Sequence, residues 1–202
     1  MLTADDEENR HNYGFQAGSD YHLDPKGKMI LEKVYLSLGA NLGDRLNNLA
    51  RARREISKIK NTRILSFSSI YETLPWGQEK QPDFLNQAAA LETALEPMEL
   101  LAALQAIEIK MGRQKREKWG PREIDIDILL FGNLIIVSEQ LIIPHPLLRK
   151  RLFVLVPLQE LEPELVFPED GASIEEVLNS VSPRERNEIR KKMASPADTP
   201  NH

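Results

Sequence analysis

The chain has 202 residues, of which 41% are hydrophobic and none is cysteine, and its formal net charge is −5. This length suits a single domain with a sizeable core, but the chain has no residue for a disulfide or a thiolate and no apolar run near the roughly 18–20 residues of a membrane helix. A general nucleic-acid-binding protein would show a net basic surface, so the charge argues against that class.

The chain begins with a polar segment. Residues 1–32 carry seven acidic and three basic side chains and show little periodicity, so they are predicted to form an acidic, disordered extension. They lack the apolar stretch of a secretory signal, and the cytoplasm is the expected location. Residues 33–182 are predicted to form one folded domain, and residues 183–202 a polar, loosely ordered tail.

The spacing of apolar residues predicts the elements of the folded domain. In chain order they are a strand at 34–38, a helix after the turn at 39–44, strands at 63–72 and 84–95, a helix from Pro97 to Gly112, and a strand that contains Asp125 and Asp127. Proline favours the first turn of a helix and glycine its C-terminal end.

The later elements are shorter. Gly132 and Asn133 predict a tight hairpin turn into 134–137, residues 144–146 lead into a helical turn, residues 153–158 are either a strand or a buried helix, and 173–181 predict a closing helix. Two helices on one face of an antiparallel or mixed sheet make an α+β sandwich that is ferredoxin-like in outline.

Two aspartates in an apolar strand are the strongest chemical signal. Asp125 and Asp127 are two residues apart and therefore share one face of the strand, while Ile124, Ile126 and Ile128 take the other. A carboxylate in apolar surroundings is costly unless it is paired, and Mg²⁺ with a polyphosphate would pair two. The alternative is an edge strand with a solvated acidic face.

Basic residues precede the aspartates. Arg122 lies three residues before Asp125, and residues 113–118 include Arg113, Lys115 and Arg116. Cations next to a metal-binding acid pair suit a bound triphosphate, although a solvated charge run would look the same. Gln105 and Glu108 share a helix face beside this loop; they either border a nucleotide pocket or are ordinary surface residues.

Aromatic and amide side chains suggest a site for a planar ring. Phe84 and Asn86 share a strand face, and an aromatic plate next to an amide suits a flat, hydrogen-bonding heterocycle. Trp76 and Trp119 lie in loops, where they either stack on such a ring or pack against the core. His145, between two prolines, is either a structural hydrogen-bonding residue or a phosphate contact.

Together these residues resemble the 6-hydroxymethyl-7,8-dihydropterin pyrophosphokinase family of folate biosynthesis, over roughly residues 34–181. The motifs that carry the resemblance are LGANLGD at 38–44, SSIYET at 68–73, QPDFLN at 81–86, WGPR at 119–122 with DID at 125–127, and PHP at 144–146. Their order along the chain also matches the family.

The resemblance implies a ferredoxin-like fold for residues 33–182 as a catalytic domain. It also implies a reaction in which ATP gives its terminal diphosphate to the hydroxymethyl oxygen of the pterin, leaving AMP. Asp125 and Asp127 would hold two Mg²⁺ ions, and Arg113 and Arg122 would assist catalysis.

The resemblance also implies two sets of binding residues. Those at the ATP site would be Gln105, Glu108, Arg113, Lys115, Trp119, Arg122, Ile128, His145 and Arg151. Those around the pterin would be Thr73, Pro75, Trp76, Phe84, Asn86, Trp119 and Phe153. Whether Lys115 or Arg116 contacts phosphate stays open. No membrane or nucleic-acid partner is expected.

Two other functions remain possible from the sequence. A ferredoxin-like module for single-stranded RNA would use the loop tryptophans and the basic loop, but an acid pair without metal would repel phosphate. A metal-dependent phosphohydrolase would use the same acids and would release free phosphate rather than a diphosphorylated pterin.

Overall fold

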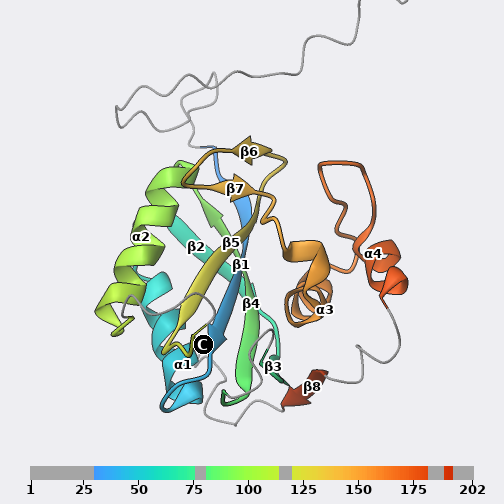
Figure 1. Ribbon diagram of the computed structural model, residues 1–202. Coiled ribbons are helices and arrows are strands. Elements are labelled where there is room, and N and C mark those ends of the chain that lie inside the picture. The colour runs from blue at the N-terminus through green and yellow to red at the C-terminus, as the bar shows by residue number, and fades with distance from the viewer. Residues whose placement is uncertain (1–29, 76–80, 114–119, 182–188, 193–202) are drawn as a thin grey trace, which may run out of the picture. The chain divides into compact units, whose positions relative to one another are not determined.

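The structure is a computed structural model, and it describes residues 30–75, 81–113, 120–181 and 189–192. Its contacts separate Met1–Ile30 from Leu31–His202. The predicted extension at 1–32 lies mostly outside the described residues, and the domain boundaries stay predictions. All elements below belong to the second unit (Figure 1).

The fold is built on a six-stranded sheet in which β1 occupies a central position. The sheet order is β5-β1-β4-β3-β8, and β2 also pairs with β4; all of these pairings are antiparallel. The strands are β1 (Glu32–Ala40), β2 (Thr62–Phe67), β3 (Ile70–Thr73), β4 (Phe84–Thr93), β5 (Asp125–Phe131) and β8 (Ile189–Lys192).

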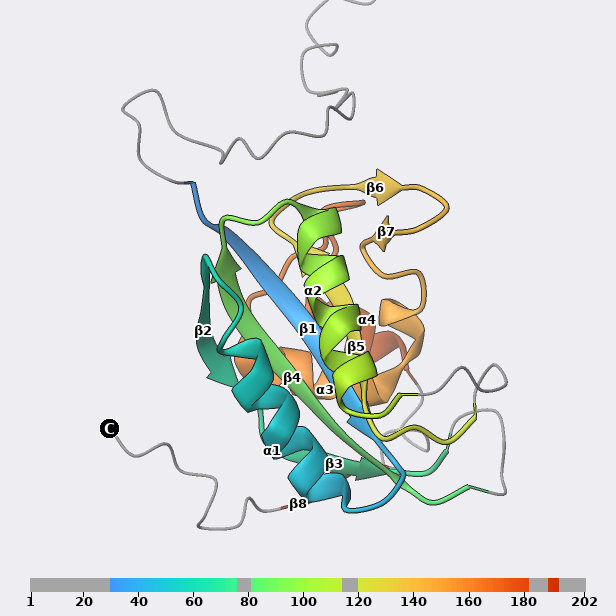
Figure 2. The same ribbon diagram turned by 90° about the vertical axis from the view of Figure 1, so that its left-hand side faces the viewer.

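Helices cover both faces of this sheet. On one face lie α1 (Arg45–Ile56) and α2 (Pro97–Lys110), which face the viewer in Figure 2; on the other lie α3 (Leu152–Leu161) and α4 (Ile174–Ser180). The antiparallel sheet with packed helices confirms the predicted α+β sandwich. Of the helices that the structure describes, none combines the length and apolar character needed to cross a bilayer.

The alternation of β1 explains the two layers. Val34, Leu36 and Leu38 point into the core under α1 and α2, whereas Tyr35 points into a second core with α3 and α4. Successive residues of a strand face opposite sides, so β1 contributes to both cores. The apolar run 153–158, for which both a strand and a buried helix were predicted, is helical and supplies the second layer.

The helix boundaries follow the capping signals in the sequence. The side chain of Asp44 accepts a hydrogen bond from Asn47 N at 3.1 Å and caps α1. Pro97 is the first residue of α2. Gly112, with φ of 100°, follows the end of α2 in a conformation that favours glycine, as predicted.

Three predicted elements differ from the structure. The single strand at 63–72 is split into β2 and β3, because Ser68 exchanges hydrogen bonds with the backbone of Ala88 through its own N–H and its Oγ. The hairpin predicted at Gly132 is wrong: β6 (Ile136–Val137) pairs with β7 (Ile142–Ile143) rather than with β5. Gly132 N donates to Lys33 O at 2.7 Å, so the residue after β5 is still bonded to β1. Beyond it the chain does not continue as a strand of this sheet.

The third difference concerns the C-terminal end. β8 pairs with β3, although the sequence predicts a loose tail from residue 183. A strand of four residues with three basic side chains carries little patterning of its own, and its pairing depends on the neighbouring edge of β3.

Candidate active site

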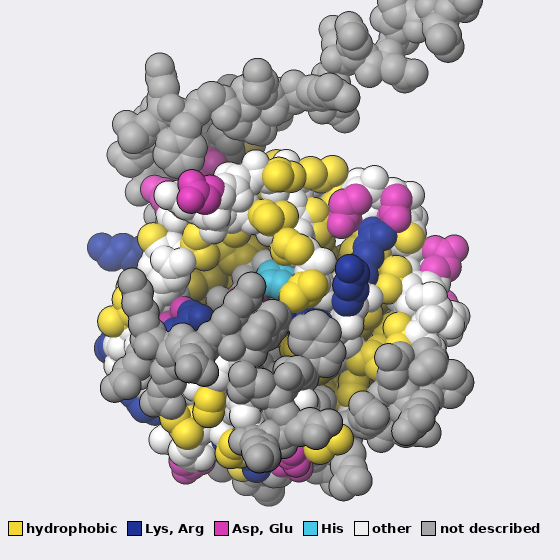
Figure 3. Space-filling view, in the orientation of Figure 1, with side chains coloured by type: hydrophobic (Ala, Val, Ile, Leu, Met, Phe, Trp, Pro, Cys, Tyr) yellow, Lys and Arg dark blue, Asp and Glu magenta, His cyan; other side chains and the backbone are white. Residues whose placement is uncertain are grey.

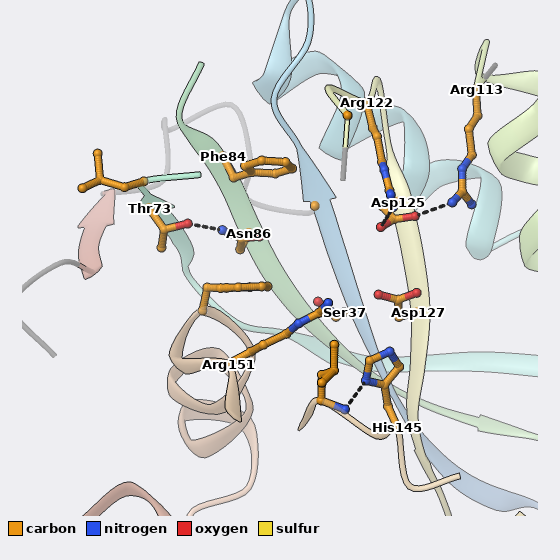
Figure 4. Close-up of a pocket in the computed structure, with 15 residues that line it drawn as sticks. Ser37, Thr73, Phe84, Asn86, Arg113, Arg122, Asp125, Asp127, His145 and Arg151 are labelled. Carbon is orange, nitrogen blue, oxygen red and sulfur yellow. Dashed lines mark hydrogen bonds and ion pairs between the residues drawn. The ribbon is translucent and has the colours of Figure 1, made fainter. Parts of the chain in front are cut away.

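One cavity of about 340 Å³ collects most of the predicted site residues (Figure 4). Side chains from β1, β4, β5 and the start of α3 line it. The predicted residues in its lining are Thr73, Phe84, Asn86, Arg113, Arg122, Asp125, Asp127, His145, Arg151 and Phe153. In Figure 3 a histidine side chain is visible with hydrophobic side chains next to it.

The two aspartates point from β5 into the cavity on the same side, as predicted (Figure 4). In the sheet register Asp125 lies opposite Gly39, and Asp127 lies opposite Ser37. Both partners on β1 are small, so the space in front of the carboxylates stays open. Ser37 and Gly39 line the same cavity; neither was predicted as a site residue, although Gly39 lies in the LGANLGD motif.

The two carboxylates have different surroundings. Asp125 forms ion pairs with Arg122 Nη1 and, at 2.8 Å, with Arg113 Nη2. No hydrogen bond or ion pair joins the carboxylate of Asp127 to another residue in the described ranges. Desolvation, and next the charge of Asp125, raise the pKa of Asp127 above its ordinary value. A cation at this position would relieve the cost of the charged form.

Glu108 lies behind the acids rather than in the cavity lining. The residue is 2% exposed, and its Oε1 accepts a hydrogen bond from Ile126 N at 2.7 Å. Its Oε2 pairs with Arg113 Nη1. β5 is an edge strand, so its outward N–H groups need partners, and Glu108 supplies one between the two aspartates.

Arg113 therefore bridges a helix and a strand. Its guanidinium contacts Glu108 on α2 and Asp125 on β5. Desolvation lowers the pKa of Arg113, but the charges of Asp125 and Glu108 outweigh it and the pKa is raised overall. With Arg122 and Arg151, Arg113 is one of three guanidinium groups in the lining, which is a favourable arrangement for phosphate oxygens.

His145 is held in one tautomer by the turn that follows it. Its backbone N–H donates to Leu129 O at 2.9 Å, and its Nδ1 accepts a hydrogen bond from Leu147 N at 3.2 Å. Burial, and then the charge of Arg151, lower the pKa of His145. The neutral ring consequently carries its proton on Nε2 and can donate from that atom. Leu147 lines the cavity and was not predicted there.

The other side of the cavity suits a planar ring. Asn86 Nδ2 donates to Thr73 Oγ1 at 2.8 Å, and both side chains are buried. This bond fixes the amide, whose Oδ1 lies 3.3 Å from the position that a Cβ on Gly39 would take. Phe84, from the same strand face, and Phe153, from α3, supply aromatic surfaces.

Some predicted residues lie elsewhere. Gln105 is exposed on α2, Pro75 is partly exposed at the end of a described segment, and Ile128 is buried in the core beneath α1 and α2. Trp76, Lys115 and Trp119 lie outside the described residues, as does Arg116. In the part of the chain that the structure describes, no group of three or more His, Cys, Asp or Glu side chains is placed to hold a metal ion.

A family model described as 7,8-dihydro-6-hydroxymethylpterin-pyrophosphokinase (HPPK) matches residues 35–163. The chain is also similar to proteins named 2-amino-4-hydroxy-6-hydroxymethyldihydropteridine pyrophosphokinase. The Haemophilus influenzae protein is 45% identical over 135 residues, which are 67% of this chain and 84% of the relative. The Bacillus subtilis protein is 47% identical over 128 residues, which are 63% and 77% of the two chains.

Solved structures give the same fold. A Plasmodium falciparum HPPK-DHPS structure with pterin and p-hydroxybenzoate aligns at a TM-score of 0.62 and 16% identity, over 80% of this chain and 45% of that chain. The complex of the same protein with pteroate aligns at a TM-score of 0.61 and 17% identity, over 78% of this chain and 44% of that chain. This chain thus spans less than half the length of these structures.

Proposed function

The chain belongs to the 7,8-dihydro-6-hydroxymethylpterin-pyrophosphokinase family, and we propose that the cavity between β4 and β5 is where it performs this family's reaction. The protein is a transferase of folate biosynthesis. It moves the diphosphate of ATP to the hydroxymethyl group of 6-hydroxymethyl-7,8-dihydropterin and leaves AMP.

The observation that carries the placement is the division of a single cavity into two chemically different halves. On the β5 side, three arginines and two carboxylates line the cavity; on the β4 side, the lining contains a buried amide and two aromatic side chains. The first half suits a metal-bound triphosphate and the second a planar ring with hydrogen-bonding edges. Only one strand, β1, separates the two.

The acid pair fits magnesium, the metal that serves this family. Mg²⁺ is usually held by one or two carboxylates, with substrate phosphates and waters as its other ligands, so a set of two acids is sufficient. Asp125 and Asp127 would hold two such ions. When bound there, Mg²⁺ neutralises charge on the phosphates and increases the acidity of the attacking hydroxyl.

The arginines neutralise charge on the group being transferred. Arg113 and Arg122, which pair with Asp125 in the absence of substrate, exchange part of that contact for phosphate oxygens. Arg151 and the Nε2–H of His145 bind the phosphates as well. Phosphoryl-type transfer needs little covalent assistance from protein, so positioning and charge stabilisation supply most of the rate.

The remaining predicted residues divide between the two substrates. Gln105 and Glu108 belong to the ATP side, where Glu108 acts through Arg113 and Ile126, and Ile128 supports the strand from the core. Lys115 as an ATP contact, and Trp119 as a contact of ATP and of the pterin, stay proposals for residues outside the described ranges.

On the pterin side, Phe84 and Phe153 stack on the ring. Asn86 forms hydrogen bonds with the edge of the ring, and its hydrogen bond to Thr73 fixes the orientation of the amide. Pro75 and Trp76 stay proposed pterin contacts; Pro75 is not in the cavity lining, and Trp76 lies outside the described residues.

The reaction products test the assignment. The protein is incubated with ATP, Mg²⁺ and 6-hydroxymethyl-7,8-dihydropterin, and the products are identified by mass spectrometry. We expect equal amounts of AMP and pterin diphosphate. Free phosphate or diphosphate without a modified pterin would instead identify a phosphohydrolase.

A further inference from the structure

Asn41, the residue after β1, connects two parts of the site without lining the cavity. It is 1% exposed, and both its backbone N–H and its side-chain amide have partners on other segments. A buried amide with all of its contacts on other segments fixes how those segments lie relative to each other.

The first contacts hold the backbone of Arg122. Asn41 Oδ1 accepts a hydrogen bond from Arg122 N at 2.7 Å. In return, Asn41 N and Leu42 N both donate to Arg122 O at 3.1 Å. The peptide groups on both sides of the Arg122 Cα are therefore fixed, and so is the point from which its guanidinium reaches Asp125.

The second contacts hold the segment before β4. Asn41 Nδ2 donates to Gln81 Oε1 at 3.2 Å and to Pro82 O at 3.3 Å. Two residues later β4 begins at Phe84, which lines the cavity. The neighbouring Arg45 Nη1 donates to Asp83 O at 2.7 Å, so this segment is attached to the region after β1 by two side chains.

We propose that Asn41 is a positioning residue that couples the pterin half of the site to the arginine that serves the phosphate half. This inference rests on the proposed function of the two halves. One carboxamide performs both tasks because it has an acceptor for Arg122 N–H and donors for the carbonyl oxygens of the other segment. An aspartate side chain at this position keeps only the acceptor, and an alanine side chain has neither the acceptor nor the donors.

Two substitutions separate the tasks. Asn41→Asp retains the acceptor for Arg122 N–H but places negative charge against Pro82 O; the KM for the pterin rises about tenfold, while the KM for ATP stays within about twofold. Asn41→Ala removes the side-chain contacts to both segments and leaves Arg122 O with its two backbone donors. It lowers kcat by about 10²-fold, the size of effect that a displacement of about 1 Å produces.

Asn48→Ala is the matched control. Asn48 Nδ2 donates to Leu42 O at 2.9 Å in the same turn, and within the described part of the chain no hydrogen bond joins the Asn48 side chain to residues 81–83 or to Arg122. Its loss lowers the melting temperature but leaves both KM values and kcat within about twofold. Equal kinetic effects of Asn41→Ala and Asn48→Ala, compared at equal folded fractions, would refute the coupling.

Hydrogen exchange tests the coupling without turnover. Amides of residues 81–86 and 120–124 exchange faster in Asn41→Ala than in wild type, and in Asn41→Asp the increase is confined to residues 81–86. Unchanged exchange in these segments overturns the proposal even if the enzyme is active. Conversely, a wild-type protein that makes no pterin diphosphate overturns the proposed function, while the exchange pattern still decides whether Asn41 couples the segments.

Discussion

Glu108 accepts a hydrogen bond at 2.7 Å from the backbone N–H of Ile126, the residue that separates the two aspartates of β5. The same carboxylate pairs with Arg113. Glu108 on α2 thus helps to fix the position of the edge strand β5, and with it the positions of its two aspartates.

Replacing Glu108 therefore disturbs both structure and activity. Glu108→Ala leaves the Ile126 N–H without its partner, while Arg113 keeps its ion pair with Asp125. A buried donor left without an acceptor costs about 1–3 kcal/mol. We expect a lower free energy of unfolding, measured by urea denaturation, and a lower kcat.

Glu108→Gln separates these effects. It keeps an acceptor for Ile126 N–H and loses the charge that holds Arg113. We expect it to recover more than half of the lost stability but less of the lost kcat. If Glu108→Gln and Glu108→Ala were equally unstable, the hydrogen bond to β5 would not carry the stabilisation.

Asp127→Asn should improve stability while it removes activity. The raised pKa of Asp127 means that its charged form is disfavoured in the folded protein without metal, so a neutral amide raises the melting temperature by about 2–5 °C in EDTA at pH 7. AMP release should fall by at least about 10³-fold.

Asp125→Asn is the comparison for that variant. It loses two ion pairs with arginines and should lower the melting temperature under the same conditions. Chelation of Mg²⁺ should stop turnover by the wild type and leave its melting temperature within about 2 °C, because substrate supplies most of the metal ligands. A melting temperature that drops steeply in EDTA would point to a structural metal.

Gly39 keeps the floor of the cavity open. In Gly39→Ala the new Cβ would lie 3.3 Å from Asn86 Oδ1 and 3.9 Å from Phe84 Cδ1, so the amide must shift against its bond to Thr73. We expect the KM for the pterin to rise about tenfold, with a smaller change in the KM for ATP.

Gly171→Ala is the control for this prediction. Gly171 has φ of 74°, and among the described residues no atom lies within 4 Å of the position that a Cβ would take there, so alanine strains the backbone without touching the site. It should lower stability and leave both KM values unchanged. Steady-state kinetics with each substrate varied in turn would measure both variants, and an unaffected pterin KM in Gly39→Ala would contradict the contact with Asn86.

Ionisation of Tyr35 is expected to lower the stability of the folded protein at alkaline pH. Its Oη donates to Glu162 Oε2 at 2.6 Å, and burial followed by this hydrogen bond raises its pKa from 10.0 to about 12. The unfolded chain loses this proton first as pH rises, so the folded state binds more protons in that window. The stabilising contribution of Tyr35 is complete below pH 10 and is lost between pH 10 and about 12.

Tyr35→Phe tests this pH dependence. The variant should be less stable than wild type by about 1 kcal/mol at pH 8, because it lacks the hydrogen bond. The difference should narrow as pH rises from 10 to 12. Chemical denaturation at a series of pH values would measure it, and a constant difference across that range would exclude the ionisation of Tyr35 as the cause.

Features within a single strand or helix could be predicted from the sequence, because they depend only on how side chains repeat along that element. The shared face of Asp125 and Asp127, and that of Phe84 and Asn86, follow from the two-residue repeat of a strand, and both pairs line the cavity. Gly112 and Pro97 bound a helix through their own backbone preferences.

Features that depend on contacts between distant segments could not be predicted. The position of Glu108 beneath β5 depends on the packing of α2 on an edge strand. Residues 153–158 are apolar throughout, and such a run does not distinguish a strand from a buried helix. Ser37 and Gly39 matter through their small size opposite the acids, which becomes visible only with the strand register.

The order β5-β1-β4 also fixes the distance between the two halves of the cavity that we propose bind the two substrates. Neighbouring strands lie about 4.8 Å apart, so the acids and the ring-binding side chains start from backbones roughly 9–10 Å apart. Backbone hydrogen bonds hold this spacing, whatever residues the surrounding loops contain. Substitutions in those loops can thus alter the affinity for each substrate. The distance between the two halves of the cavity changes only if the pairing of the strands changes.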